Sequence, residues 1–432
     1  MAKRVFFRDF VGVLNSNVVS LVGALLLIVV LTRILGTESF GRYNALIVIP
    51  LIVISFTHLG IRGASIYLLG SKKYDKDQLV SSVLIILIGS GTIGIVLSAF
   101  GFWIFQETTF NILLITMVLF IIPLKLATIY SGGIFYGNDE IKKANHLNWI
   151  INILNLLLVV LLVWWLDYGL TGAVVATLLA NLYVAVKALR MLTRQFSVKL
   201  VFYPAIIKNL LRMGLIFSMS FFVLQLNYRI DILLLEKYST IHEVGVYSLA
   251  AQIGEQLWQI PLAVSIVLFS RIANSNAKST PSNILPLTRI VLLLVSVIGI
   301  GLFIIAPYLI PLFFGKDFSS SSLMLQIILP GIVAMSVFRV LSGQLAGLGK
   351  PHVTLYIFIP ALLINISLNL LWIPQYGGKG AALASSASYF LGAIGYWIYY
   401  SYLHHQSLLE IVHFRKSDLN IVHHLLKKAR KK

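Results

Sequence analysis

The chain contains no cysteine, which excludes disulfide frameworks, thiolate metal sites and cysteine nucleophiles. It is also poor in charge, since only 11% of its 432 residues are Asp, Glu, Lys or Arg, whereas soluble domains contain about 25%. Acidic residues are the scarcest: 15 Asp and Glu stand against 34 Lys and Arg, which gives a net charge of +19. A hydrophobic content of 58% and a mean hydropathy of +0.91 exclude a soluble fold and indicate a membrane protein. We therefore expect no nucleic-acid partner, although a soluble chain this basic would suggest one.

Motifs of catalysis and nucleotide binding are missing as well. The segment Gly343–Pro351 is similar to a phosphate-binding loop, but its first glycine is one position too early, and Pro351 replaces the Ser or Thr that would hold magnesium. No HExxH helix, nucleophile elbow or pair of loop carboxylates occurs. We therefore expect a protein that is not an enzyme, needs no cofactor or metal, and takes its energy from an ion gradient, the membrane potential or the gradient of its substrate.

Apolar runs of about 20 residues recur along the chain, each long enough to cross the hydrocarbon core as a helix. The first run follows Lys3, Arg4 and Arg8, but its length and the lack of a small-residue cleavage site favour a retained helix over a signal peptide. The sequence predicts an all-α polytopic membrane protein with twelve transmembrane helices, near 11–32, 44–69, 79–104, 109–131, 147–166, 169–187, 213–235, 244–270, 288–312, 323–347, 353–373 and 380–402.

Basic residues divide unequally between the two sides of the predicted membrane. With the N-terminus in the cytoplasm, 25 Lys and Arg residues lie on the cytoplasmic side and five on the outer side. Because cytoplasmic loops are rich in Lys and Arg, we expect a multi-pass protein of the cytoplasmic membrane with both termini in the cytoplasm. The C-terminal stretch alternates apolar with basic residues, which predicts an interfacial helix on anionic lipid.

Three glycine-containing motifs occur twice, in the same order and at nearly constant spacing. Phe40–Tyr43 pairs with Val244–Tyr247 after 204 residues, Tyr168–Ala173 pairs with Tyr376–Ala381 after 208, and Ser131-Gly132 pairs with Ser342-Gly343. The alternative is that glycine recurs wherever membrane helices pack closely. We interpret the pattern as a duplication: a six-helix lobe at 1–190, a cytoplasmic linker at 191–212, a six-helix lobe at 213–402 and a basic cytoplasmic tail at 403–432. Because each copy has six spans, a pseudo-twofold axis along the membrane normal should relate them.

Charged residues fall inside the apolar runs, where each costs about 2.5–3.5 kcal/mol on insertion scales. They are Arg62, Lys125, Arg229, Asp231, Glu255 and Arg339. Helical spacing places polar neighbours on the same faces, namely His58 with Arg62, Gln225 with Arg229, and Gln252 and Gln256 with Glu255. We interpret these charged stripes as the lining of a hydrated central cavity, and we favour interhelical packing seams for the Asn sets at 145–155 and 365–369.

The charges at membrane depth sum to four positive and two negative. A net positive cavity favours an anion, above all phosphate or pyrophosphate, which arginine binds through two parallel hydrogen bonds. We expect the substrate to contact Arg62, Arg229, Arg339, Lys125, His58, Gln225, Gln252 and Gln256. Asp231 and Glu255 either couple transport to an ion or neutralise Arg229 or Arg62 as internal ion pairs, and the pattern leaves both roles open.

The segment Thr32–Tyr43 resembles the first outer-loop signature of bacterial polysaccharide-biosynthesis flippases. These are the O-antigen and capsule repeat-unit translocases of the multidrug/oligosaccharidyl-lipid/polysaccharide exporter superfamily. Asp231–Leu235, Val244–Ser248, Pro261 and Tyr376–Ala382 are similar to later stretches of the same family. The resemblance covers essentially the whole chain, and its motifs are structural, not catalytic. Some members carry two extra C-terminal helices, where this chain has a basic tail.

The resemblance implies two six-helix lobes around a cationic central cavity that opens alternately to each side of the membrane. It implies an undecaprenyl-pyrophosphate-linked oligosaccharide as the substrate, moved to the outer leaflet of a bacterial cytoplasmic (inner) membrane. Membrane lipids are further partners, H+ or Na+ is the candidate coupling ion, and we expect a monomer. Arg62, Arg229 and Arg339 correspond in kind to the cationic residues of the family's cavity.

Three other functions remain as alternatives. A drug or cation antiporter of the same superfamily needs an acidic residue in the first lobe, where Asp9 is the candidate near the first helix. A membrane enzyme such as a glycan polymerase or acyltransferase needs a large outer loop or an interfacial His/Asp site, and the sequence shows neither. A lipid scramblase would move lipids without coupling to an ion gradient.

Overall fold

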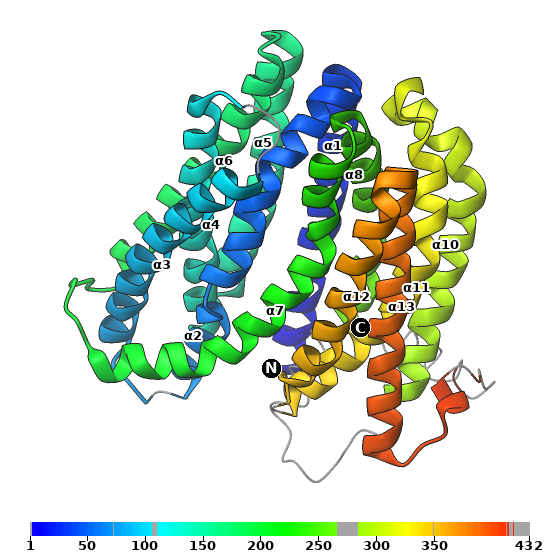
Figure 1. Ribbon diagram of the computed structural model, residues 1–432. Helices are drawn as coiled ribbons and strands as arrows, with labels where there is room; N and C mark the ends of the chain where they lie inside the picture. Colours follow the sequence, from blue (N-terminus) through cyan, green and yellow to red (C-terminus); the bar gives the residue numbers. More distant parts are fainter. Residues whose placement is uncertain are drawn as a thin grey trace. The chain divides into compact units, whose positions relative to one another are not determined.

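The computed structural model describes residues 2–71, 73–105, 110–265, 284–348, 350–411, 413 and 418, with side chains from Leu21 onward apart from those at 347, 409 and 411. Within these residues every regular element is helical (Figure 1). The long helices are α1 (Ala2–Thr57), α2 (Ile61–Gly70), α3 (Lys76–Phe105), α4 (Ile112–Gly137), α5 (Ile141–Val159), α6 (Gly169–Gln195), α7 (Pro204–Tyr238), α8 (Ile241–Glu255), α10 (Ile284–Phe314), α11 (Ser321–Gly347), α12 (Val353–Tyr376) and α13 (Gly378–His404). Short π or 3-10 turns occupy η1 (Val160–Trp165), η2 (Gln256–Trp258), η3 (Lys316–Phe318) and η4 (Leu408–Ile411).

Ten helical stretches of the described chain are long and apolar enough to cross a membrane. One of them, Leu21–Gly70, contains two predicted spans, because Gly36 adopts φ +69 and breaks the helical geometry inside α1. The eighth predicted span, 244–270, lies in α8 and continues past the described residues. Together with α8, these ten stretches account for the twelve predicted spans, so the prediction of an all-α polytopic membrane protein is confirmed.

The connections between helices are shorter than the sequence predicts. The outer loop expected at 33–43 is helical apart from the kink at Gly36. The central connection expected at 187–212 shrinks to 196–203, because α6 continues to Gln195 and α7 begins at Pro204. Proline suits the first helical turn, where its missing N–H would have no partner in any case. The helices thus extend well beyond the apolar runs from which they are predicted.

The chain folds into two compact units. The first contains Met1–Val246 and Phe313–Asp317, and the second contains Tyr247–Leu312 and Phe318–Lys432. Helix α7 belongs to the first unit, where it packs against α1, α2 and α3 (Figure 1). The sequence instead groups this helix with the second repeat, so the lobe boundaries at 191–212 stay a prediction.

The same tertiary hydrogen bond occurs once in each repeat. In the first unit the hydroxyl of Tyr43 lies 2.9 Å from that of Thr177, which joins α1 to α6. In the second unit the hydroxyl of Tyr247 lies 3.0 Å from that of Ser385, which joins α8 to α13. The two tyrosines end the first repeated motif, and Thr177 and Ser385 both lie eight residues after the second residue of the Tyr-Gly motif. Equivalent positions therefore make equivalent contacts, which supports the duplication.

Glycines repeat the correspondence at the helix contacts. A Cβ atom on Gly133, the residue after the repeated Gly132, would lie 2.8 Å from the Cα of Arg62, and one on Gly343 would lie 2.9 Å from the Cα of Ser265. Gly172 and Gly380, which are 208 residues apart, likewise meet main-chain carbonyl oxygens of the preceding helix at 2.9 and 2.4 Å. Since any side chain at these positions would collide with backbone, both repeats use glycine to bring the same helices together.

The C-terminal segment is anchored to the second unit by a buried ion pair. Arg289 Nη1 donates to the carboxylate of Asp418 at 2.8 Å, and both side chains are at most 5% exposed. Arg289 Nε also donates to the main-chain oxygen of Glu410, and Trp397 Nε1 donates to that of Leu408. The predicted interfacial helix lies mostly beyond the described residues.

Candidate functional site

The predicted site residues fall into two sets, one in each unit. The first unit holds His58, Arg62, Lys125, Gln225, Arg229 and Asp231, and the second holds Gln252, Glu255, Gln256 and Arg339. Each set is described separately below.

A bend between α1 and α2 positions His58 and Arg62. Leu59 and Gly60 adopt left-handed backbone conformations, with φ of 49° and 60°, which end α1 and turn the chain before α2. The main-chain N–H of Gly60 donates to Nδ1 of His58 at 2.8 Å, so this histidine satisfies a backbone group that the bend leaves outside the helical ladder. Arg62 follows in the first turn of α2 and is exposed.

The side chain of Arg62 stacks on an aromatic ring of α4. Its guanidinium carbon lies 5.1 Å from the ring centroid of Tyr136, within the range of a cation–π contact. The hydroxyl of the same tyrosine donates to Oδ1 of Asn145 at 2.8 Å and accepts from Nδ2 of Asn148 at 3.4 Å. The ring therefore joins the cation of α2 to two carboxamides of α5.

The remaining cations of the first unit lie on α4 and α7. Lys125 is half-buried and lies close enough to Arg229 for the two charges to repel each other. Since like charges at low dielectric disfavour each other, an anion that binds between Lys125 and Arg229 is favoured by both.

The acidic and amide groups of the first unit line α7. Asp231 has no exposed surface, and neither has Asn227, one helical turn before it. Gln225 and Arg229 on the same helix are half-buried. Asp231 is thus fully buried among helices, whereas Lys125 and Arg229 are only half-buried.

The second unit places an arginine against a tryptophan. The guanidinium carbon of Arg339, on α11, lies 4.6 Å from the ring centroid of Trp258 in η2. The indole N–H of Trp258 donates to the main-chain oxygen of Ile332 at 3.0 Å, and its ring contacts Tyr389 edge to face. Two residues before Trp258, Nε2 of Gln256 donates to the main-chain oxygen of Gln252 at 3.2 Å. The structure thus stacks Arg339 on the tryptophan that follows the polar residues of α8 and η2.

Sequence reasoning missed Tyr136 and Trp258, the two rings under the arginines. Tyr136 is 74 residues from Arg62 and Trp258 is 81 from Arg339, so no local spacing links either pair. One signal in the sequence could have identified Trp258. Tryptophan is enriched at membrane interfaces, but Trp258 lies among polar residues in the middle of a predicted span.

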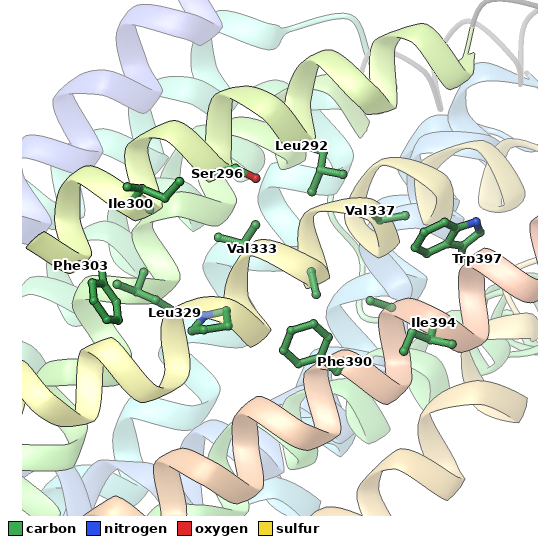
Figure 2. A pocket seen from close by; sticks show the side chains of 14 residues that line it. Leu292, Ser296, Ile300, Phe303, Leu329, Val333, Val337, Phe390, Ile394 and Trp397 are labelled. Atoms are coloured by element: carbon green, nitrogen blue, oxygen red, sulfur yellow. The ribbon is translucent and has the colours of Figure 1, made fainter. Parts of the chain in front are cut away.

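An apolar groove in the described part of the second unit contains none of the predicted residues. It has a volume of about 570 Å³ and lies between α10, α11 and α13 (Figure 2). Apart from Ser296 and the indole of Trp397, its lining is apolar, and most of it is leucine, isoleucine, valine and phenylalanine, such as Phe303 and Val333. Such a lining suits an apolar chain and offers no partner for a charged group or a sugar. Within the described residues, no three His, Asp or Glu side chains cluster as a metal site would require.

Comparison with known proteins places the chain among membrane transporters. A family model described as "Polysaccharide biosynthesis protein" matches residues 8–269, and one described as "MatE" matches residues 216–371. The first covers more than half of the chain. An uncharacterised membrane protein of Methanocaldococcus jannaschii is 26% identical over 397 residues, which are 88% of this chain and 94% of that protein. The capsular polysaccharide biosynthesis protein CapF of Staphylococcus aureus is 23% identical over 402 residues, 91% of this chain and 98% of CapF.

Solved structures share the fold. The lipid II flippase MurJ, in an inward closed conformation, superposes with a TM-score of 0.73 at 16% identity, covering 94% of this chain and 89% of MurJ. An inward-facing multidrug resistance transporter of the MATE family superposes with a TM-score of 0.70 at 17% identity, covering 90% and 96% of the two chains.

A shorter sequence match, 37% identity over 100 residues, links the chain to a probable multidrug resistance protein NorM of Bacillus cereus, with 22% of each chain covered. The family and the structural neighbours are transporters and flippases.

Proposed function

The chain belongs to the polysaccharide biosynthesis protein family, and from this membership we propose that it is a flippase for an undecaprenyl-pyrophosphate-linked oligosaccharide in the bacterial cytoplasmic membrane. The chain is a membrane transporter or flippase of the multidrug/oligosaccharidyl-lipid/polysaccharide superfamily. The lipid-linked substrate, the cytoplasmic position of both termini, a monomeric state and coupling to H+ or Na+ through Asp231 or Glu255 are parts of the proposal.

The observation that carries the proposal is the presence of three cations on the membrane-spanning helices of the first unit. They are Arg62, Lys125 and Arg229, and Lys125 and Arg229 are close enough to repel each other. A site that holds positive charges together at low dielectric favours a polyanion, and pyrophosphate offers the oxygen pairs that a guanidinium binds through two hydrogen bonds. In this mechanism the pyrophosphate binds these cations from the cytoplasmic side, and alternating access then exposes the site outward.

Substitution of the arginines tests the proposal. We expect the double variant Arg62→Ala/Arg229→Ala, in the native host, to abolish surface polysaccharide while the protein stays in the membrane at its normal level. Arg62→Lys should fall between wild type and Arg62→Ala, because lysine keeps the charge but lacks the planar fork. Surface polysaccharide per cell and membrane-bound protein are the two measurements. Arg190→Ala, which removes an exposed arginine of α6, is the matched control. Normal polysaccharide in the double variant contradicts the proposal.

A second candidate function is an ion-coupled drug or cation antiporter. It is favoured by the MatE match at 216–371 and by the similarity to the probable multidrug resistance protein NorM. The charge of the first unit opposes it, because a cationic drug would bind beside Arg62, Lys125 and Arg229. We expect less than a twofold change in drug resistance when the chain is expressed in a host that lacks its own efflux pumps. Resistance that rises several-fold and disappears in Asp231→Asn would favour the antiporter.

A further inference from the structure

A polar surface beside Arg62 is formed by three side chains that the stripes of the sequence do not connect. Tyr136 lies at the end of α4, and Asn145 and Asn148 lie on the second and third turns of α5. The tyrosine hydroxyl is hydrogen-bonded to both carboxamides, at 2.8 and 3.4 Å, and the ring carries the guanidinium of Arg62 on its face at 5.1 Å. Three helices thus contribute to one continuous surface, which we call the Tyr136 surface (Arg62, Tyr136, Asn145 and Asn148).

The exposure of these side chains distinguishes them from a packing seam. Asn148 is exposed, and Tyr136 and Asn145 are half-buried. In α12, by contrast, Asn365 and Asn369 have no exposed surface and hydrogen-bond to each other, as residues that join helices do. The two Asn sets, which the sequence describes alike, therefore play different roles.

The position of Asn148 along α5 adds to this distinction. It lies five residues beyond Lys143, or about 7.5 Å along the helix axis, and α5 with η1 forms one apolar membrane-spanning stretch. An exposed carboxamide is costly against hydrocarbon, so this part of the helix must meet water or a polar ligand. The carboxylate of Glu140, in the turn before α5, is already paired with Lys143 at 2.7 Å.

The chemistry of the Tyr136 surface matches a sugar bound next to a phosphate. A carboxamide offers donors and an acceptor side by side, and a sugar presents neighbouring hydroxyls that both donate and accept. An aromatic ring adds an apolar face for the C–H groups of the sugar, and a few placed polar groups around such a face set ligand orientation. The guanidinium of Arg62 on the same ring supplies the partner for the phosphate. We propose that the Tyr136 surface binds the sugar nearest the pyrophosphate, with Asn148 contacting its hydroxyls; this rests on the proposed function.

Binding of two ligands to the purified protein tests the inference. The first is the lipid-linked oligosaccharide fraction extracted from the native host, and the second is farnesyl pyrophosphate, which has the pyrophosphate and an isoprenoid chain but no sugar. Asn148→Leu and Tyr136→Phe should each weaken binding of the glycan-bearing lipid about five- to tenfold, which corresponds to one lost hydrogen bond. Both should leave binding of farnesyl pyrophosphate within twofold of wild type. Thr92→Val, which alters an exposed polar side chain of α3, is the control.

The outcomes separate this inference from the proposed function. Arg62→Ala should weaken binding of both ligands, because it removes the pyrophosphate partner. Wild-type protein that binds neither ligand overturns the proposed function and the inference together. If wild type binds both ligands but Asn148→Leu leaves binding of the glycan-bearing lipid unchanged, or weakens both ligands equally, the sugar assignment alone is wrong. Equal thermal unfolding midpoints for the variants and wild type show that the variants are folded.

Discussion

Two arginines at membrane depth lie flat against aromatic rings, Arg62 on Tyr136 and Arg339 on Trp258. Stacking uses the face of the guanidinium, and its in-plane N–H groups remain donors for other partners. The aromatic ring therefore contacts the face of each guanidinium and holds the cation in place in an apolar protein.

The stack in the second unit gives a prediction at the scale of single residues. Trp258→Leu removes the aromatic face under Arg339 and the N–H bonded to the oxygen of Ile332. We expect the protein to lose about 2 kcal/mol or more of stability, since a desolvated cation–π contact contributes about that much. The measurement is thermal unfolding of the detergent-purified protein.

A double-mutant cycle isolates the stack from the rest of the tryptophan's packing. If Arg339→Gln destabilises Trp258→Leu as much as it destabilises wild type, the two side chains are independent and the stack contributes nothing.

The bend between α1 and α2 is the element that places His58 and Arg62, and it depends on a close approach of α7. A Cβ atom on Gly214 of α7 would lie 2.1 Å from the main-chain oxygen of Leu59, and one on Gly60 would lie 2.2 Å from that of Gly214. Ser218, one turn further along α7, donates to the oxygen of Phe56 at 2.8 Å and so compensates a carbonyl near the end of α1. The bend and α7 thus form one packed element.

Gly214→Ala should disturb this element. The added methyl group meets backbone atoms, which cannot rotate away, so we expect a loss of about 1–3 kcal/mol in stability and a displaced Arg62. Gly301→Ala in α10 is the matched control, because no atom lies within 4 Å of the position that its Cβ would occupy and alanine raises helix propensity by about 1 kcal/mol. Thermal unfolding compares the two variants. A Gly214→Ala protein at least as stable as the Gly301→Ala protein would contradict the close approach.

At the scale of the whole molecule, the two repeats preserve their internal contacts although their sequences have diverged. Tyr43 with Thr177 and Tyr247 with Ser385 make the same hydroxyl contact at 2.9 and 3.0 Å. Packing contacts of this kind have thus been kept in both copies.

The equivalence of the two tyrosine contacts is testable. Tyr43→Phe and Tyr247→Phe should each cost about 1 kcal/mol, the usual net contribution of one hydrogen bond. Because the two contacts lie in separate units, their effects should add in the double variant. Chemical or thermal unfolding measures all three variants, with Tyr402→Phe, whose side chain is 80% exposed, as the control. A strongly unequal pair of losses would argue against equivalent roles.

Hydropathy and spacing were sufficient to predict the helices and the duplication. A membrane-spanning helix needs a run of apolar residues, which is a local property of the chain, and Gly172 and Gly380 recur because the same helices must touch in both copies. Helix ends were predicted less well: the loop expected at 33–43 is helix apart from Gly36, because helices continue past the apolar runs on which the prediction depended. The positive-inside rule also gives an orientation, which stays a prediction.

The sequence alone therefore determined that this is a twelve-helix membrane protein with few acids and a cationic set of residues at membrane depth, because hydrophobic length and charge are properties of the chain itself. Only the tertiary structure decided which side chains meet. It placed Arg62 on Tyr136, put Lys125 beside Arg229, buried Asp231, and left Asn148 exposed while it buried Asn365. These contacts join residues far apart in the sequence, and their geometry depends on how helices pack, which periodicity along one helix does not specify.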